Sequence, residues 1–408
     1  MVIDVYDSKG GGIVSTKRFT EHLRKRGHKV IVISTGKTEK DKLVLEKYYP
    51  RGFKRIMKKM KMAFAKPDEK KIKDVFKMVD VVHVQLPFLL GIKSITYAKE
   101  LNLPVVTSFH VQAENITKNL RITTKRTVKM IYKYFLKKFY NRSDIVICPS
   151  IFAKKELKDF GLKSHAEVIS NGFPDFFYPK KFKRKYNDKF VILSVGRLAI
   201  EKNHKLIIDA VSLSKYKNDI RLVIVGDGPL KNDLKKYARI LKKVDFLGSI
   251  SNEKLLMWYN TSDLYVHAGE VELEGMTVLE AMACSLPILV SNSEKSAAKQ
   301  FAINEKSLFS DAKDLAKKID YWYEHPEKLS KEKEKYLELS KKYNIHKSVK
   351  KLESCYIKAI KLNKKDSAEG KKDNVRAWVR LLKYIYKYIA KKIHKRKVAK
   401  TNKKREKM

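Results

Sequence analysis

Short apolar runs alternate with longer amphipathic segments along the first half of the chain. Runs of this length, bounded by glycine, proline and charged residues, are typical of strands buried on both faces of a sheet. The segments between them carry apolar residues at helical spacing. We therefore predict a β-α alternation with strands over residues 2–6, 30–34, 81–85, 105–109, 144–150 and 167–170.

The alternation restarts after residues 171–179, a turn-rich, proline-bounded stretch without a helical period. The strands predicted in the second half occupy residues 190–195, 221–225, 245–247, 264–267 and 288–290. Repeated βαβ units in both halves favour two doubly wound domains over one large sheet. We place the first domain over residues 1–175 and the second over 184–345, with the chain helical from about residue 311 onward.

The first predicted strand leads into Gly10-Gly11-Gly12 and then a helix over about residues 13–26. Strand, glycine turn and helix form the beginning of a Rossmann-like unit. The turn alone is weak evidence, because any tight β-to-α connection uses glycine.

A second strand-to-helix unit, residues 265–290, carries more chemistry. Gly275 and Met276 stand where its helix begins, and exposed N–H groups and the helix dipole favour a phosphate there. Glu272 and Glu280 lie eight positions apart around this turn, with Glu274 between them. On these residues alone, an acidic solvated loop before an ordinary amphipathic helix is the better explanation of the pattern.

Charged and titratable residues also follow other predicted strands. Arg197 and Lys202 come after residues 190–195, and two cations at a strand end can neutralise a diphosphate. His110 follows residues 105–109, at the edge where α/β sheets bind ligands. Taken singly, such a histidine is more often a packing residue, and two cations mean little in a lysine-rich chain. Glu114 lies four positions beyond His110.

The charge balance is extreme. Ninety-one Lys and Arg stand against 45 Asp and Glu in 408 residues, a formal net charge of +46. Such an excess implies an anionic partner, either nucleic acid or an acidic membrane surface, although a lysine-rich genome composition accounts for part of it. Hydrophobic residues make up 43%, which excludes a wholly disordered chain.

Positive charge accompanies apolar stripes in three segments, residues 51–66, 118–142 and 375–393. The pattern is typical of helices that lie on a membrane surface, while core-facing helices with lysine-rich outer faces remain the alternative. No run is long enough to span a bilayer, and no signal peptide is expected. Three separated cysteines fit a reducing compartment.

Glu272-x7-Glu280, followed by Ala281-Met282-Ala283-Cys284 and Leu286-Pro287, resembles the E-x7-E signature of retaining family 4 (group 1) glycosyltransferases. Gly196-Arg197 with Lys202 is similar to the G-R-x4-K pattern of the same family. This chain departs from the family at Glu274, where Phe is usual, and at Ser285, where Gly is usual.

The resemblance implies the GT-B fold, in which two Rossmann-like domains face each other across a cleft, here followed by a basic helical extension over residues 363–408. A helix over residues 346–362 would cross back to the first domain. The implied site residues are His110 and Glu272 at the donor sugar, Glu280 at the ribose, Arg197 and Lys202 at the diphosphate, and Gly11, Gly12, Gly228, Gly275 and Met276 as further donor contacts. Glu114 is a weaker candidate, for contact with the acceptor.

The glycine loop and the stretch SFHVQAEN are similar to bacterial diacylglycerol glucosyltransferases. The resemblance therefore implies retaining transfer of a hexose, with UDP-glucose as co-substrate, to a lipid at the inner face of the cell membrane. No Asp-x-Asp motif stands in the expected cleft, so no metal or other cofactor is predicted. Diacylglycerol is the expected acceptor, and we expect a cytoplasmic, peripheral enzyme.

Two alternatives stay open at this point. One is a glycosyltransferase of surface polysaccharide or protein. The other is a nucleic-acid-binding protein on a degenerate enzyme fold. Neither zinc-finger spacing nor an aromatic RNP-type strand is found, so a nucleic acid partner is not expected.

Overall fold

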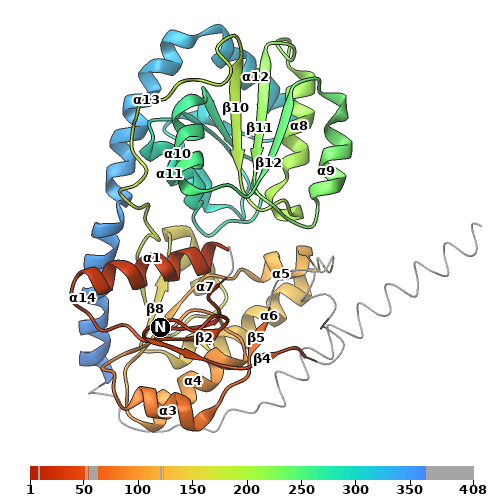
Figure 1. Ribbon diagram of the computed structural model, residues 1–408. Coiled ribbons are helices and arrows are strands. Elements are labelled where there is room, and N and C mark those ends of the chain that lie inside the picture. Colours follow the sequence, from red (N-terminus) through yellow and green to blue (C-terminus); the bar gives the residue numbers. More distant parts are fainter. Residues whose placement is uncertain (8–9, 51–53, 55–62, 120–121, 123, 364–408) are drawn as a thin grey trace, which may run out of the picture.

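The structure is a computed structural model that describes residues 1–7, 10–50, 54, 63–119, 122 and 124–363. It forms two lobes stacked one on the other (Figure 1). Each lobe is built on a parallel sheet with helices packed against it, which confirms the predicted α/β class with two Rossmann-like domains.

The first sheet has seven strands in the order β3-β2-β1-β6-β7-β8-β9, all paired in parallel. Its strands are β1 (Val2–Val5), β2 (Val32–Thr35), β3 (Lys42–Val44), β6 (Val82–Val84), β7 (Val105–Ser108), β8 (Ile145–Cys148) and β9 (His165–Val168). The helices of this domain are α1 (Gly11–Lys25), α3 (Glu69–Phe76), α4 (Leu89–Glu100), α5 (Ala113–Asn119), α6 (Lys125–Lys138) and α7 (Ile151–Asp159). A small antiparallel pair, β4 (Lys47–Tyr48) and β5 (Phe64–Ala65), accompanies them.

The second sheet has six strands in the order β12-β11-β10-β13-β14-β15, again all parallel. They are β10 (Phe190–Val195), β11 (Ile220–Val225), β12 (Val244–Gly248), β13 (Leu264–His267), β14 (Ile288–Ser291) and β15 (Leu308–Phe309). The helices are α8 (His204–Leu213), α9 (Lys231–Tyr237), α10 (Asn252–Thr261), α11 (Met276–Ala283), α12 (Ala312–Glu324), α13 (Pro326–Ser340) and α14 (Ile345–Asn363).

Both strand orders reverse at one point, and that point positions the candidate site. In the first sheet the chain leaves β1 toward β2 and later returns on the other side as β6. In the second sheet β10 and β13 hold the same relation. Open α/β sheets bind ligands outside the carboxyl ends of the strands at such switch points. The loops after β1, β10 and β13 therefore lie where a ligand is expected.

Each central strand is apolar on both faces, because helices cover both sides of the sheet. Along β10, Val191, Leu193 and Val195 belong to one apolar cluster, with α10 and α11. Ile192 belongs to a second cluster, with α8 and α12. Two-sided burial explains why these strands appear in the sequence as continuous apolar runs rather than alternating ones.

The chain passes between the domains twice, and the two passages lie side by side. Phe173 N donates to Tyr343 O at 3.1 Å, and Ile345 N donates to Phe173 O at 3.0 Å. Gly172 has a φ of 67°, and a Cβ there would lie 2.8 Å from Ile345 Cα, so the close approach requires glycine.

The last described helix, α14, returns to the first domain (Figure 1). Its buried residues Ile345, Val349, Leu352, Cys355 and Ala359 belong to the apolar cluster that also contains Phe19 and Leu23 of α1 and Ile145 and Ile147 of β8. α14 thus completes a core that begins near the N-terminus.

Several local expectations were wrong or lie outside the described residues. Phe64, assigned to a basic helix, lies in β5 instead. The apolar residues of α6, including Ile131 and Phe135, are buried in the core rather than presented to a membrane. Residues 55–62 and the extension over 364–408, with its segment 375–393, lie outside the described residues. No helix in the described ranges is long and apolar enough to cross a bilayer.

Candidate active site

The candidate site lies between the two sheets, and the loop from β13 to α11 forms its centre. Backbone hydrogen bonds fix this loop: Glu272 N donates to Lys295 O at 3.1 Å, and Ala297 N donates to Glu272 O at 2.8 Å. Glu270 N donates to Glu201 O at 2.9 Å. The carboxylates of the loop therefore have defined positions.

Two helices begin at this place, one from each domain. α11 starts after Gly275, whose φ of 99° lies in the left-handed region that favours glycine. A Cβ on Gly11, at the start of α1, would lie 3.9 Å from Met276 Sδ. Three of the predicted donor residues, Gly11, Gly275 and Met276, therefore lie together. The free N–H groups and the dipoles of both helix N-termini favour an anion here.

Glu272 forms an ion pair with Lys202 inside the second domain. Lys202 ends the 3-10 turn Ile200–Lys202 after β10, and its side chain is 21% exposed. Burial lowers the pKa of Lys202 to about 8. The buried His267 at the end of β13 places Nε2 3.2 Å from Glu272 Oε1, and burial holds its pKa well below its usual range. The imidazole is therefore neutral at physiological pH.

Arg197 stands beside this ion pair, directly after β10 and Gly196. Its positive charge contributes to the lowered pKa of Lys202, although burial is the larger cause. Within the described part of the chain, the half-buried Arg197 side chain forms no ion pair of its own. The carboxyl end of β10 therefore carries two cations, Arg197 and Lys202. Of these two, only Lys202 has a carboxylate partner among the described residues.

Glu280 forms its ion pair across the domains. Arg18 of α1 donates through Nη2 to Glu280 Oε1 and through Nη1 to Gly172 O at 2.9 Å. The other carboxylate oxygen, Oε2, accepts a hydrogen bond from the buried Tyr259 hydroxyl at 3.1 Å. The Glu280 side chain is only 6% exposed.

His110 lies on the first-domain side of the site. A Cβ on Gly12 would come within 3.0 Å of His110 Cβ, so the glycine allows α1 to approach the histidine. His110 Nε2 lies 3.1 Å from Gln85 Oε1, a geometry that fits Nε2–H donating and leaves Nδ1 as an acceptor. Burial lowers the pKa of His110 to about 4, so the ring is neutral at physiological pH.

Glu114 belongs to a buried pair of carboxylates that also contacts both domains. Lys295 of the second domain places Nζ 3.2 Å from Glu114 Oε1 and 3.6 Å from Glu156 Oε1. Tyr132 of α6 donates to Glu114 Oε2 at 3.0 Å. Burial, followed by the charge of Glu114, raises the pKa of Glu156 to about 7.

Glu274 points away from the centre of the site, toward the connection between the domains. Its Oε2 accepts from Asn171 N at 3.0 Å and from Asn171 Nδ2 at 2.7 Å. Ser15 of α1 donates to Asn171 Oδ1 at 2.6 Å. Burial raises the pKa of Glu274 to about 7. Glu274, one of the two departures from the family pattern, is therefore a contact between the domains.

Gly228 has a packing reason to be glycine. A Cβ there would lie 2.4 Å from Leu198 O, in the loop that carries Arg197. Gly228 thereby supports the position of that loop, and its contact with a nucleotide stays a prediction.

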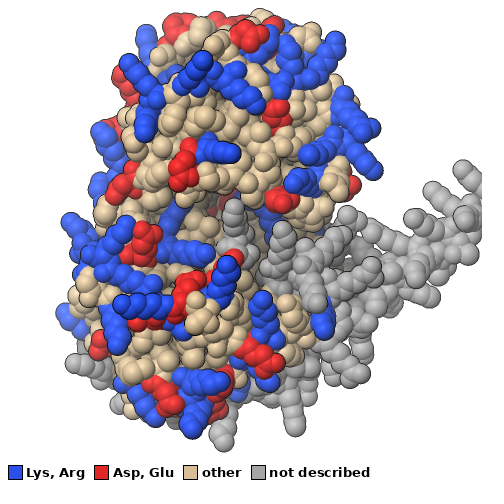
Figure 2. Space-filling model, viewed as in Figure 1, with Lys and Arg blue, Asp and Glu red and all other residues tan. Residues whose placement is uncertain are grey.

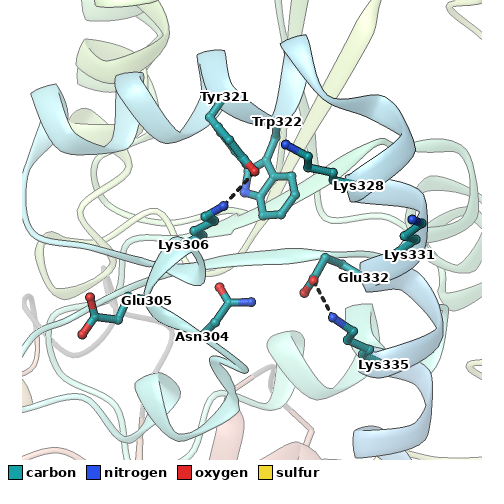
Figure 3. A pocket seen from close by; sticks show the side chains of 9 residues that line it. All are labelled: Asn304, Glu305, Lys306, Tyr321, Trp322, Lys328, Lys331, Glu332 and Lys335. Atoms are coloured by element: carbon teal, nitrogen blue, oxygen red, sulfur yellow. Dashed lines mark hydrogen bonds and ion pairs between the residues drawn. The ribbon is translucent and has the colours of Figure 1, made fainter.

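A cavity of about 480 Å³ lies elsewhere, on the outer side of the second domain between α12 and α13 (Figure 3). Two of its lysines already have partners: Lys306 Nζ donates to the Tyr321 hydroxyl at 2.8 Å, and Lys335 Nζ to Glu332 Oε1 at 3.0 Å. None of the predicted site residues lines it.

Sequence reasoning missed several residues of this site, chiefly Arg18, Asn171, Glu156, Tyr259, His267 and Lys295. His267 could have been found, because it ends a predicted strand just as His110 follows one. The others carry no local signal, since each acquires its role from a partner far away in the chain. Among the described residues, no cluster of three or more His, Cys, Asp or Glu side chains could hold a metal ion.

Two facing Rossmann-like domains with carboxylates, cations and helix N-termini between them define a GT-B glycosyltransferase. Family models agree: Glycosyltransferase Family 4 matches residues 9–175, and Glycosyl transferases group 1 matches residues 178–353. The chain belongs to the group 1 glycosyltransferases.

Among curated proteins, the chain is similar to alpha-monoglucosyldiacylglycerol synthases. The Streptococcus pneumoniae protein is 29% identical over 314 residues, covering 70% of this chain and 69% of that protein. The Acholeplasma laidlawii protein is 26% identical over 393 residues, covering 87% and 96%. Other relatives are mannosyl and sulfoquinovosyl transferases. In fold, the chain is similar to Anabaena HepE in complex with UDP and glucose, with a TM-score of 0.69 and 15% identity over 87% of this chain and 97% of that one.

Proposed function

We propose that this chain transfers a glucosyl residue from UDP-glucose to a membrane lipid such as diacylglycerol, with retention of the anomeric configuration and without a metal cofactor. The observation that carries the proposal is the gathering of Glu272, Glu280, Arg197 and Lys202 beside two helix N-termini, at the switch points of two facing sheets.

Each group suits one part of a nucleotide sugar. Departure of a nucleoside diphosphate develops negative charge, which Arg197, Lys202 and the helix N-termini would stabilise. Glu272 would accept hydrogen bonds from hexose hydroxyls, and Glu280 from the ribose. The neutral His110, with Nε2–H directed to Gln85, would offer Nδ1 to a hexose hydroxyl.

Support for a lipid acceptor comes from the names of the relatives and from the charge of the first domain. α6 directs Tyr132 inward to the predicted acceptor contact Glu114. The outer face of α6 presents exposed basic residues, and the helix contains no Asp or Glu. The exposed basic residues are Lys125, Arg126, Lys129, Lys133 and Lys137. Figure 2 shows Lys and Arg on both lobes as well. We propose that α6 holds the enzyme on the anionic inner face of the cell membrane by charge.

The test is a screen of radiolabelled UDP-glucose and GDP-mannose against diacylglycerol in zwitterionic and anionic vesicles. We expect glucosyl transfer from UDP-glucose, faster on anionic vesicles, with the same anomer in product and donor by NMR. Transfer from GDP-mannose instead would replace the donor assignment, and an inverted anomer would refute retention. No turnover with any donor would overturn the proposal.

Membrane attachment through α6 has its own variant. Lys129→Glu/Lys133→Glu should lower sedimentation with anionic vesicles, because each basic residue near such a surface contributes about 1 kcal/mol. The matched control is Lys235→Glu/Lys236→Glu, the same charge change on exposed residues of α9 in the second domain. Equal losses in both variants would indicate general charge rather than docking through α6.

A further inference from the structure

Both oxygens of the carboxylate assigned to the ribose already have partners within the chain. Arg18 donates a hydrogen bond to Glu280 Oε1, and the Tyr259 hydroxyl donates to Glu280 Oε2 at 3.1 Å. With 6% of the side chain exposed, little of the carboxylate remains open to a further donor of hydrogen bonds. A ribose carries two neighbouring hydroxyls that would need these same oxygens.

Arg18 belongs to the opposite domain, so its ion pair also joins the two domains. The guanidinium reaches Glu280 of α11 from α1, 262 residues away in sequence, and holds Gly172 O at 2.9 Å in the connection. Its side chain is 13% exposed. The same connection ties Asn171 to Ser15 of α1 and to Glu274 of the acidic loop. Arg18 is therefore the charged member of a network that runs from α1 through the connection to the site.

Tyr259 and Arg18 differ in how easily their side chains can move away from Glu280. Tyr259 is buried in the second domain, and its hydroxyl also donates to Thr277 O at 3.3 Å. Arg18 reaches Glu280 from the other domain, so its contact depends on the position of the two domains relative to each other. Removal of Arg18 would leave a buried carboxylate without its cation, a costly state that two ribose hydroxyls would partly relieve.

We propose that Arg18 is an internal competitor of the donor: it occupies the ribose carboxylate in the empty enzyme and must release it when the nucleotide binds. This inference rests on the proposed function, because it takes Glu280 as the ribose ligand. It assigns Arg18 a regulatory contact that sets the affinity for any ligand that contains the ribose.

The proposal predicts that removal of the Arg18 guanidinium strengthens the binding of UDP. Arg18→Gln should bind UDP more tightly than the wild type, by roughly tenfold, because the competing charged pair is gone. Pyrophosphate lacks the ribose, so its affinity should not change. If Arg18 instead stays in place and orients Glu280, the same variant should bind UDP more weakly.

The experiment is calorimetric titration of the full chain with UDP, GDP and pyrophosphate. Arg18→Lys is the second variant, which keeps a positive charge on α1 and should show a smaller gain. Arg26→Gln is the matched control, because it removes the arginine at the C-cap of the same helix, and the ion pair of Arg26 with Glu353 of α14 is remote from the site. Thermal unfolding verifies that each variant is folded.

The outcomes separate the two proposals. If the wild type binds neither UDP nor GDP, the proposed function fails. If the wild type binds UDP, but both Arg18 variants bind it equally or more weakly, only the role of Arg18 as a competitor fails. Tighter binding of pyrophosphate as well would also overturn it, because the gain would then not depend on the ribose.

Discussion

The two carboxylates of the Glu-x7-Glu segment are both paired with a cation, but the pairs differ in their connection to the fold. Glu272 is paired with Lys202 of its own domain, at the end of a neighbouring strand in the same sheet. Glu280 is paired with Arg18 of the other domain. The first pair depends only on the fold of the second domain, whereas the second also depends on the position of the two domains relative to each other.

This difference separates two properties of the enzyme. Changes at the Glu272–Lys202 pair act on the chemistry of the donor within one domain. Changes at contacts between the domains, such as Arg18–Glu280 and Lys295–Glu156, act on ribose binding or on stability. Each of the variants that follow breaks one kind of contact and leaves the other intact.

The largest effect is expected at the cations of the second domain. Lys202→Ala and Arg197→Ala should each lower kcat by about 10² to 10³, because each removes charge that stabilises the departing diphosphate. The control is Lys205→Ala, an exposed lysine three positions from Lys202 whose partner is Asp209. Steady-state kinetics with UDP-glucose is the measurement, and equal losses at all three positions would contradict the assignment.

The same assay tests metal independence. Activity should be unchanged by EDTA, because Arg197 and Lys202 supply the positive charge. Activity that disappears with EDTA and returns with Mg²⁺ or Mn²⁺ would show that these cations are not sufficient.

The next effect concerns the Lys295–Glu156 contact between the domains. The pKa of Glu156, about 7 in the folded chain, lies above its ordinary value of 4.5. Between these values the folded chain binds more protons than the unfolded chain, so the contribution of Glu156 to stability falls as the pH rises. Glu156→Gln lacks this titration. The difference in free energy of unfolding, Glu156→Gln minus wild type, should therefore increase between pH 4.5 and 7. The total increase should be about 3 kcal/mol, at about 1.4 kcal/mol per pKa unit.

Urea unfolding of both proteins from pH 5 to pH 8 measures this divergence. Histidine titrations, such as that of His204 with its pKa lowered to about 3, are common to both proteins and cancel in the difference. Glu21→Gln, the same substitution at a surface carboxylate that is 61% exposed, is the matched control. Parallel curves for Glu156→Gln and the wild type would exclude a buried carboxyl with a raised pKa.

The smallest of these effects distinguishes the two carboxylates directly. Glu280→Gln should raise the donor KM by about tenfold with a smaller change in kcat, because it weakens ribose binding in the ground and transition states alike. Glu272→Gln should mainly lower kcat and change the preference among sugars. A pattern in which both variants change the same parameter would remove the distinction between the two pairs.

Much of the fold follows from sequence pattern alone, because the central strands are apolar on both faces. The ranges predicted for β10 and β13 agree residue for residue with the structure. Missed elements include β4 and β15, two-residue strands whose pairing depends on neighbours rather than on a pattern of their own. Phe64 was assigned to a helix because its spacing fits one, but pairing with Tyr48 makes it part of a strand.

For the candidate site, the predictable part is the part that is local in the chain. Glu272, Glu280, Arg197 and Lys202 follow predicted strands at family spacing. Arg18 and Asn171 could not be found in this way, because what defines them is a contact across more than 100 residues. Glu274 shows the limit most clearly: its departure from the family pattern is visible in the sequence, but its contact with Asn171 is not.

The return of α14 to the first domain has a consequence for how the protein is made. The core beside α1 and β8 includes Leu352, Cys355 and Ala359, which are synthesised long after the rest of that domain. The first domain therefore leaves the ribosome with an apolar face that α14 does not yet cover. The whole second domain must be synthesised before α14 is available. Domains generally fold in the order of their synthesis, but here the domain that starts first can finish only last.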